Sequence, residues 1–190
     1  MKRLTFAIAL ISTITASAFA APKTFNLDPN HSMPRFEYNH LGYSTQSHAF
    51  DKISGKIVFD REAKTGSVDI TIDAKSVNTG YALFNKDIQG EEYLDTEKYP
   101  DITFKSTSVK FDGDKPVAVK GNLTIKGITK PVTLTVTSFL EMPHPIYNKK
   151  EAIGANAVVK IKRSEFNMSK YVPYVSDDVT LNIGIEALKE

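Results

Sequence analysis

Alternation of apolar and polar residues with a period of two constrains the fold of this chain more than any other feature. The clearest run lies near the C-terminus, where apolar residues at Val179, Leu181, Ile183, Ile185 and Ala187 alternate with polar or small ones. This period indicates strands that bury one face. Comparable segments lie at 31–40, 49–60, 67–74, 102–108, 117–125, 132–138 and 153–161. The sequence therefore predicts about eight strands.

Turn sequences and one helical segment complete the pattern. Asp112-Gly113-Asp114 and Lys126-Gly127 predict tight connections between antiparallel neighbours. The segment from Tyr81 to Leu94 has spacing closer to that of a helix, although Gly90 interrupts it. The expected fold is all-β and antiparallel, with one short helix inserted between the third and fourth strands.

Short hairpins between about eight strands favour an up-and-down barrel. Such a barrel is wide enough to be filled by its own side chains or to hold one small ligand. A barrel that spans a membrane needs an apolar outer face. One face of these strands instead carries Asp69, Asp73 and Lys105, so we expect a barrel that does not span a membrane.

The expected inward positions decide whether the barrel is filled. Several of them are small, namely Ser106, Ser108, Gly121, Ser138, Ala155 and Ala157. Small inward residues predict an apolar cavity with some hydroxyl groups. The alternative is that large aromatic residues and the helix fill the space. Both interpretations remain open at this point.

The N-terminus predicts export. Lys2-Arg3 precedes an apolar run from Leu4 to Ile14, and Ala18-Phe19-Ala20 fits a cleavage site. This is the pattern of a signal peptide over residues 1–20, with the barrel domain over 21–190. The run is too short for a membrane anchor. Removing it leaves 24 − 2 = 22 basic and 22 acidic residues, so we expect no binding to nucleic acid.

No catalytic or metal-binding constellation is visible. The chain has no cysteine, and its four histidines lack the spacing of metal ligands. Asp28, His31 and Ser32 resemble parts of a hydrolase site only in composition, and we expect Asp28 and Ser32 to pin the start of the barrel. We therefore expect a protein that is not an enzyme and has no cofactor.

A set of short motifs occurs in a characteristic order along the whole predicted mature chain. They are Asp28-Pro29-Asn30-His31-Ser32, Phe36, His40-Leu41-Gly42, Phe59-Asp60, Tyr99-Pro100, residues 102–106 (ITFKS), residues 121–132 (GNLTIKGITKPV), Arg163-Ser164-Glu165-Phe166 and residues 175–179 (VSDDV). This ordered set resembles the YceI-like family of polyisoprenoid-binding proteins.

The resemblance implies a lipocalin-like eight-stranded antiparallel barrel with a helix near one end. It also implies a periplasmic carrier that encloses an amphiphilic long-chain lipid, such as an isoprenoid quinone or a polyprenyl phosphate, and a possible homodimer. The helix differs from the pattern of the family, whose helix often carries an Arg, an Asp and a His. This chain has Phe84, Asn85 and Asp87 in the corresponding region. That difference favours a neutral head group.

We expect the ligand to contact mainly apolar side chains. The candidates are Phe36, Tyr38, Phe50, Leu83, Phe84, Ile88, Tyr93, Phe104, Ser106, Leu123, Leu134, Arg163, Phe166 and Met168. Tyrosine hydroxyls or Ser106 could donate a hydrogen bond to a quinone carbonyl. Arg163 either contacts the head group or closes the barrel end through a salt bridge to Asp178 or Asp60. The alternative function is a filled barrel that binds partners through residues 141–150 and 169–176.

Overall fold

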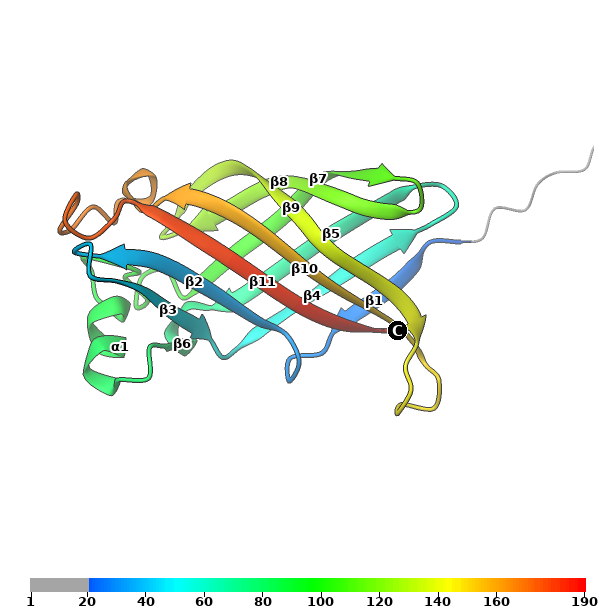
Figure 1. Ribbon diagram of the computed structural model, residues 1–190. Coiled ribbons are helices and arrows are strands. Elements are labelled where there is room, and N and C mark those ends of the chain that lie inside the picture. Colours follow the sequence, from blue (N-terminus) through cyan, green and yellow to red (C-terminus); the bar gives the residue numbers. More distant parts are fainter. Residues whose placement is uncertain (1–20) are drawn as a thin grey trace, which may run out of the picture.

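Eight antiparallel strand paths close into a barrel in this computed structural model, which describes residues 21–190 (Figure 1). The first three paths are each bent into two strands, β1 (Lys23–Leu27) with β2 (Met33–His40), β3 (Ser44–Phe50) with β4 (Ile53–Asp60), and β5 (Thr65–Asp73) with β6 (Val77–Asn78). The other five are β7 (Asp101–Asp112), β8 (Lys115–Ile125), β9 (Ile128–Pro143), β10 (Glu151–Lys162) and β11 (Asp178–Lys189). The predicted signal peptide lies outside the described residues.

Each path pairs with its neighbours in the sequence, and the last path pairs with the first. β11 contacts β1 at its C-terminal end and β2 further along, which closes the sheet. β4 likewise pairs with β1 and β5, while β3 pairs with β2 and β6. The predicted all-β antiparallel barrel is therefore confirmed. The segment 49–60, expected as one strand, is broken at Asp51-Lys52.

The bend between β1 and β2 is held by side chains. Ser32 Oγ donates to the carbonyl of Glu186 and accepts from its N–H, both at 3.1 Å. His31 Nδ1 lies 2.8 Å from Asp28 Oδ2 inside the same turn. These contacts let β1 and β2 share one edge of β11, so the prediction that Asp28 and Ser32 pin the start of the barrel is confirmed.

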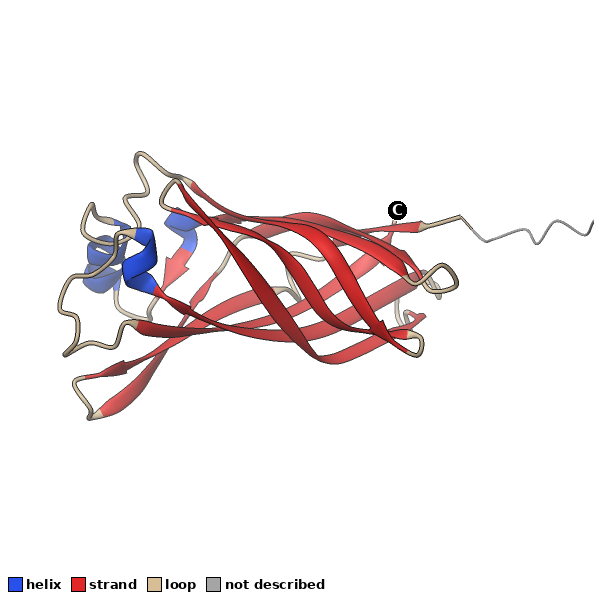
Figure 2. Ribbon diagram, turned by 90° about the horizontal axis from the view of Figure 1, so that it is seen from above, coloured by secondary structure: helices blue, strands red, loops and turns tan. Residues whose placement is uncertain are grey.

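One α-helix lies at one end of the barrel (Figures 1 and 2). Helix α1 (Ala82–Gln89) is shorter than the segment expected to be helical, and Gly90 ends it by donating its N–H to the Asp87 carbonyl. Short 3₁₀ turns lie at Ala74–Ser76 and Arg163–Phe166. Within residues 21–190, the helices are all too short or too polar to cross a membrane.

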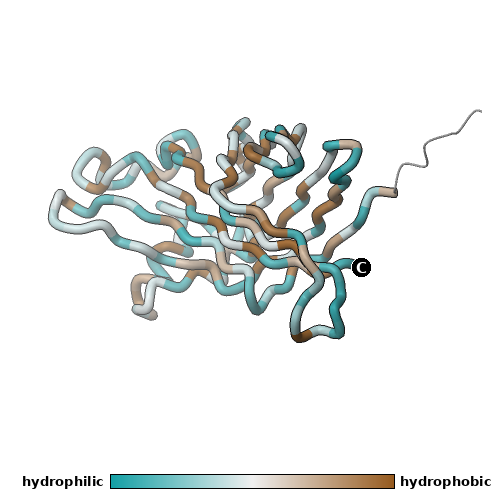
Figure 3. Tube along the Cα trace, turned by 45° about the vertical axis from the view of Figure 1, so that its right-hand side comes forward, coloured by the Kyte–Doolittle hydropathy of each residue, from teal (hydrophilic) through white to brown (hydrophobic). Residues whose placement is uncertain are grey.

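Hydrophobic and hydrophilic residues alternate along the strands (Figure 3), but two β-bulges change which residues face inward. Ser106 pairs with Gly121 whereas Ser108 pairs with Lys120, so Thr107 is an extra residue. A second irregularity lies beside Ser138 in β9. Because a shift of one residue reverses the facing of a strand, Ser108 and Ser138 are exposed rather than inward, which corrects the expectation.

Gly121 faces inward as expected, but it does not leave empty space. A Cβ atom at Gly121 would lie 2.4 Å from Cζ of Phe104 and 2.6 Å from the Lys105 carbonyl oxygen. The Phe104 ring therefore covers the glycine, and its close approach requires the missing side chain.

We predict that Gly121→Ala lowers the free energy of unfolding by about 1–3 kcal/mol, because the added methyl group overpacks against Phe104 and backbone. Gly154→Ala is a matched control in another strand, since its nearest neighbour would lie at 3.8 Å. Urea denaturation measures both variants. Equal stability of the two variants would contradict this account of Gly121.

Candidate functional site

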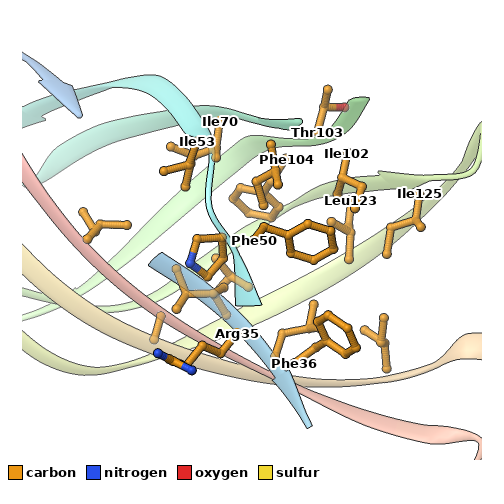
Figure 4. A pocket seen from close by; sticks show the side chains of 18 of the residues that line it. Arg35, Phe36, Phe50, Ile53, Ile70, Ile102, Thr103, Phe104, Leu123 and Ile125 are labelled. Carbon is orange, nitrogen blue, oxygen red and sulfur yellow. The ribbon is translucent and has the colours of Figure 1, made fainter. Parts of the chain in front are cut away.

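A cavity of about 370 Å³ occupies the interior of the barrel. It is lined by inward side chains of β2 to β5, β7 to β11 and α1. The rings of Phe36, Phe50 and Phe104 approach this space from three strands (Figure 4), and those of Phe36 and Phe50 lie 5.5 Å apart. Among the described residues, the lining contains no Lys, Asp or Glu. The size and the apolar wall are those of a small-molecule site.

Half-buried apolar residues face the cavity. Ala155 and Ala157 of β10 and Leu181, Ile183 and Ile185 of β11 line it and keep part of their surface accessible. A filled interior would bury these inward positions completely. The expectation that Ala155 and Ala157 leave space inside the barrel is therefore confirmed.

The end of the barrel away from α1 contains a cluster of aromatic rings. Phe59 packs against Phe111 and Phe139 with ring centroids 5.9 and 5.1 Å apart. Phe25 of β1, which pairs with Ile57 of the neighbouring strand β4, is completely buried. These large residues occupy part of the interior on this side, and Phe59 and Phe139 also line the cavity.

The end that carries α1 is covered by the helix and a loop. Phe84 and Ile88 of α1 line the cavity, and Tyr171 and Val175 of the loop before β11 do so as well. The β2–β3 hairpin holds this loop, because the Leu41 N–H donates to the Tyr174 carbonyl at 3.1 Å. The cover is thus attached to the wall.

Arg163 fixes the same loop from inside. Its side chain is 7% exposed, and its guanidinium donates to four main-chain carbonyls, which belong to Met168, Lys170, Val175 and Ser176. Burial lowers the pKa of Arg163 from its usual value. The planar group with several donors is suited to hold diverging carbonyls in one loop.

The expected salt bridges of Arg163 are wrong. Asp178 pairs with Lys162 at 2.9 Å, and Asp60 Oδ1 accepts from the Ala63 N–H at 2.8 Å. The guanidinium of Arg163 is instead hydrogen-bonded by main-chain carbonyls, because the loop places these carbonyls, and not a carboxylate, around it. Arg163 still borders the cavity.

Tyr38 and His48 form a polar pair in the aromatic wall. Tyr38 Oη lies 3.2 Å from His48 Nε2. The His48 ring, 6% exposed, lies edge-on to Phe36 and Phe84, with centroids 5.5 and 5.6 Å away. Within residues 21–190, His48 Nδ1 is buried without a hydrogen-bond partner.

Burial also shifts the pKa values of this pair. It lowers the pKa of His48 and raises the pKa of Tyr38, since both charged forms lose hydration. The sequence interpretation did not propose His48 as a site residue. A signal was present in the sequence, because His48 lies two residues before Phe50 and therefore faces the same side of the strand. A histidine is an unusual polar residue on such an apolar face.

The cavity collects all but three of the predicted ligand residues. It is lined by Phe36, Tyr38, Phe50, Phe84, Ile88, Tyr93, Phe104, Leu123, Leu134, Arg163 and Met168. Leu83 is instead 58% exposed, and Phe166 is completely buried in the core. Ser106 Oγ accepts from the Val68 N–H at 2.8 Å, so it serves the sheet. The prediction missed aliphatic lining residues such as Ile153 and Ile161, although their alternation was visible.

Comparison with known proteins agrees with this geometry. The YceI-like domain profile matches residues 25–187. "Protein YceI" of Salmonella arizonae is 34% identical over 188 residues, which cover 98% of this chain and 97% of that relative. BcnA of Burkholderia cenocepacia has a similar structure, with a TM-score of 0.72 and 28% identity over 84% of this chain and 98% of the other.

Two further solved structures extend the comparison. A Campylobacter jejuni YCEI protein has a TM-score of 0.68 at 33% identity, covering 80% of this chain and 90% of that one. A polyisoprenoid binding domain from Saccharophagus degradans has a TM-score of 0.67 and covers 87% and 98% of the two chains. At 18% identity, the latter likeness shows a shared fold.

We predict that Arg163→Lys lowers the free energy of unfolding by about 2–3 kcal/mol, because lysine cannot satisfy the four carbonyls in the same geometry. Hydrogen exchange of residues 168–176 should accelerate. Arg35→Lys is the control, because Arg35 is exposed. Within residues 21–190, its guanidinium donates a hydrogen bond to Met33 Sδ and to no main-chain carbonyl. Unchanged exchange in the loop would contradict the role of Arg163.

Acid should reduce stability through His48. Its lowered folded pKa means that the unfolded chain, with an ordinary pKa of 6.5, binds the proton more readily. The contribution of neutral His48 to the free energy of unfolding is therefore complete above about pH 6.5. It is lost as the pH falls toward the pKa of His48 in the folded protein. His48→Gln should flatten this acid-side loss in denaturation experiments at a series of pH values.

His31 provides an internal check with the opposite sign. The hydrogen bond that His31 donates to the Asp28 carboxylate raises the pKa of His31. The stabilising contribution of His31 is therefore complete below its ordinary pKa and is lost as the pH rises through the folded value. His31→Asn should remove that alkaline-side loss and leave the loss of stability just below about pH 6.5 intact. A loss of stability between about pH 6.5 and 5 that survives His48→Gln would refute the assignment to His48. At lower pH, carboxyl groups with lowered pKa values, such as Asp28 and Asp177, also lose their stabilising contributions.

Proposed function

This chain belongs to the YceI-like family, and on that premise we propose that it is a binding protein without catalytic activity. It carries an amphiphilic long-chain lipid of the isoprenoid quinone or polyprenyl type inside the barrel. The observation that carries this proposal is the apolar cavity of about 370 Å³ with half-buried inward side chains. The Saccharophagus degradans relative, described as a polyisoprenoid binding domain, supports the same ligand class.

The energetics of such binding need little specific chemistry. Burial of apolar carbon is worth about 0.8 kcal/mol per CH₂ group. A tail of a few isoprene units therefore supplies more than the roughly 8 kcal/mol that corresponds to micromolar affinity. Retention depends mainly on how much of the tail the cavity encloses.

The charges around the cavity favour a neutral head group over a phosphate. Arg163 already directs its donors to four carbonyls. Lys86 of α1 is exposed and does not line the cavity. Arg35, which also lines the cavity, is exposed. A phosphate placed beside Arg163 would have to be desolvated next to a guanidinium whose donors are already used, which is costly. An isoprenoid quinone fits this lining better than a polyprenyl phosphate.

The proposal includes export to the periplasm, which the pattern of residues 1–20 supports. The alternative function is a filled barrel that binds partner proteins through its loops. Tyr174, 74% exposed in the loop before β11, is the observation that favours this alternative. A homodimer formed through the same surface is compatible with both.

The direct test is native mass spectrometry of the exported protein, purified from its own cells without detergent. We expect cleavage after Ala20 and a stoichiometric apolar adduct, which solvent extraction then identifies. A clean mass of the polypeptide alone, unchanged after incubation with quinones and polyprenyl phosphates, would favour the alternative function.

A variant that fills the cavity separates ligand binding from folding. We predict that Ala157→Phe lowers ligand affinity at least tenfold while stability changes by no more than about 1 kcal/mol, because the new ring occupies existing space. Lys160→Phe, which adds the same ring to an exposed position of β10, is the control. Equal adduct levels in both variants would rule out this part of the cavity as the site.

A further inference from the structure

Tyr38 is a hydroxyl donor set into a mostly apolar wall, and His48 holds it there. On the basis of the proposed function, we propose that Tyr38 recognises a neutral carbonyl-type oxygen in the head group of the ligand, and that His48 is its positioning residue. Tyr38 lines the cavity, whereas His48 lies behind it between Phe36 and Phe84.

The unpaired nitrogen of His48 determines the direction of the hydrogen bond. If Nδ1 carried the proton, a buried N–H would have no acceptor within residues 21–190. Unpaired buried N–H groups are rarer in folded proteins than unpaired acceptors. The proton therefore lies on Nε2, which donates to Tyr38 Oη at 3.2 Å.

This direction leaves the Tyr38 hydroxyl hydrogen free. A tyrosine that accepts from histidine has its own O–H available for a second partner. Because Tyr38 lines the cavity, that hydrogen can point to a ligand oxygen. His48 thus holds the Tyr38 phenol in place without using the hydroxyl hydrogen. The same arrangement explains why His48 Nδ1 is the nitrogen left without a partner.

The surroundings favour an uncharged acceptor. Tyr93 and Arg163 interact electrostatically with Tyr38, so the three groups lie near the same end of the cavity, beneath α1 and the loop. Arg163 is engaged by carbonyls, and Arg35, the other arginine beside the cavity, is exposed and donates to Met33. Hydroxyl donors beside Arg163, whose N–H groups are already engaged, match a ketone, quinone or amide oxygen.

The test is a competition between ligands that differ only in the head group. Equal amounts of a prenylated benzoquinone, a prenyl monophosphate, a prenyl amide and a prenyl hydrocarbon with the same tail are added to the exported protein. Native mass spectrometry gives the ratio of adducts, which partial unfolding does not change. We expect the wild type to prefer the quinone over the hydrocarbon by about tenfold and over the monophosphate as well.

Variants then assign this preference. Tyr38→Phe should reduce the quinone-to-hydrocarbon ratio about tenfold, whereas Tyr174→Phe, the exposed control, should leave it unchanged. His48→Phe should reduce the ratio by about threefold, with no added effect in Tyr38→Phe. His48→Gln should restore it, because the amide N–H can donate to Tyr38. A structural defect alone would weaken quinone and hydrocarbon equally.

The outcomes distinguish this inference from the proposed function. Binding of hydrocarbon and quinone with the same ratio in wild type and Tyr38→Phe would overturn the role of Tyr38 and leave the lipid carrier intact. Preference for the monophosphate would overturn the neutral head group. No adduct with any of the four probes would overturn both. If the amide competes equally with the quinone, the recognised group is the carbonyl oxygen itself, as proposed.

Discussion

Closure of the backbone hydrogen-bond ladder is the constraint on which the rest of this structure depends. β11 pairs with both β1 and β2, and the bend at Asp28–Ser32 makes this double pairing possible. Once eight paths are closed, strand number and stagger set the diameter of the barrel. The interior volume is then fixed by the backbone, and the side chains decide only how much of it is filled.

The two ends of the barrel use that volume differently. At one end, Phe59, Phe111 and Phe139 pack into an aromatic cluster. Toward the other end, aliphatic side chains and alanines of β10 and β11 leave space, and Arg163 holds a loop over it. The result is a largely apolar cavity with Tyr38, Tyr93 and Arg163 near its cover. Such an arrangement suits a molecule with a long apolar tail and a small head.

Alternation in the sequence predicted the strands, the antiparallel barrel and most of the wall. It failed where the backbone departs from regular geometry, since the bulges beside Ser108 and Ser138 reverse the facing of later residues. The carbonyl partners of Arg163 could not be predicted, because no sequence pattern specifies in which direction the main-chain carbonyls of an irregular loop point. Ser106 was misassigned for a related reason, as its hydroxyl completes the sheet beside a bulge. The role of His48 depends on a contact across a hairpin that composition does not reveal.

The most direct measurement is a high-resolution crystal structure of the exported protein purified from its own cells without detergent. We predict continuous elongated density along the barrel axis, ending in an oxygen atom within hydrogen-bond distance of Tyr38 Oη. A chamber closed by rearranged side chains, or one filled with ordered water, would contradict a carrier of apolar ligands.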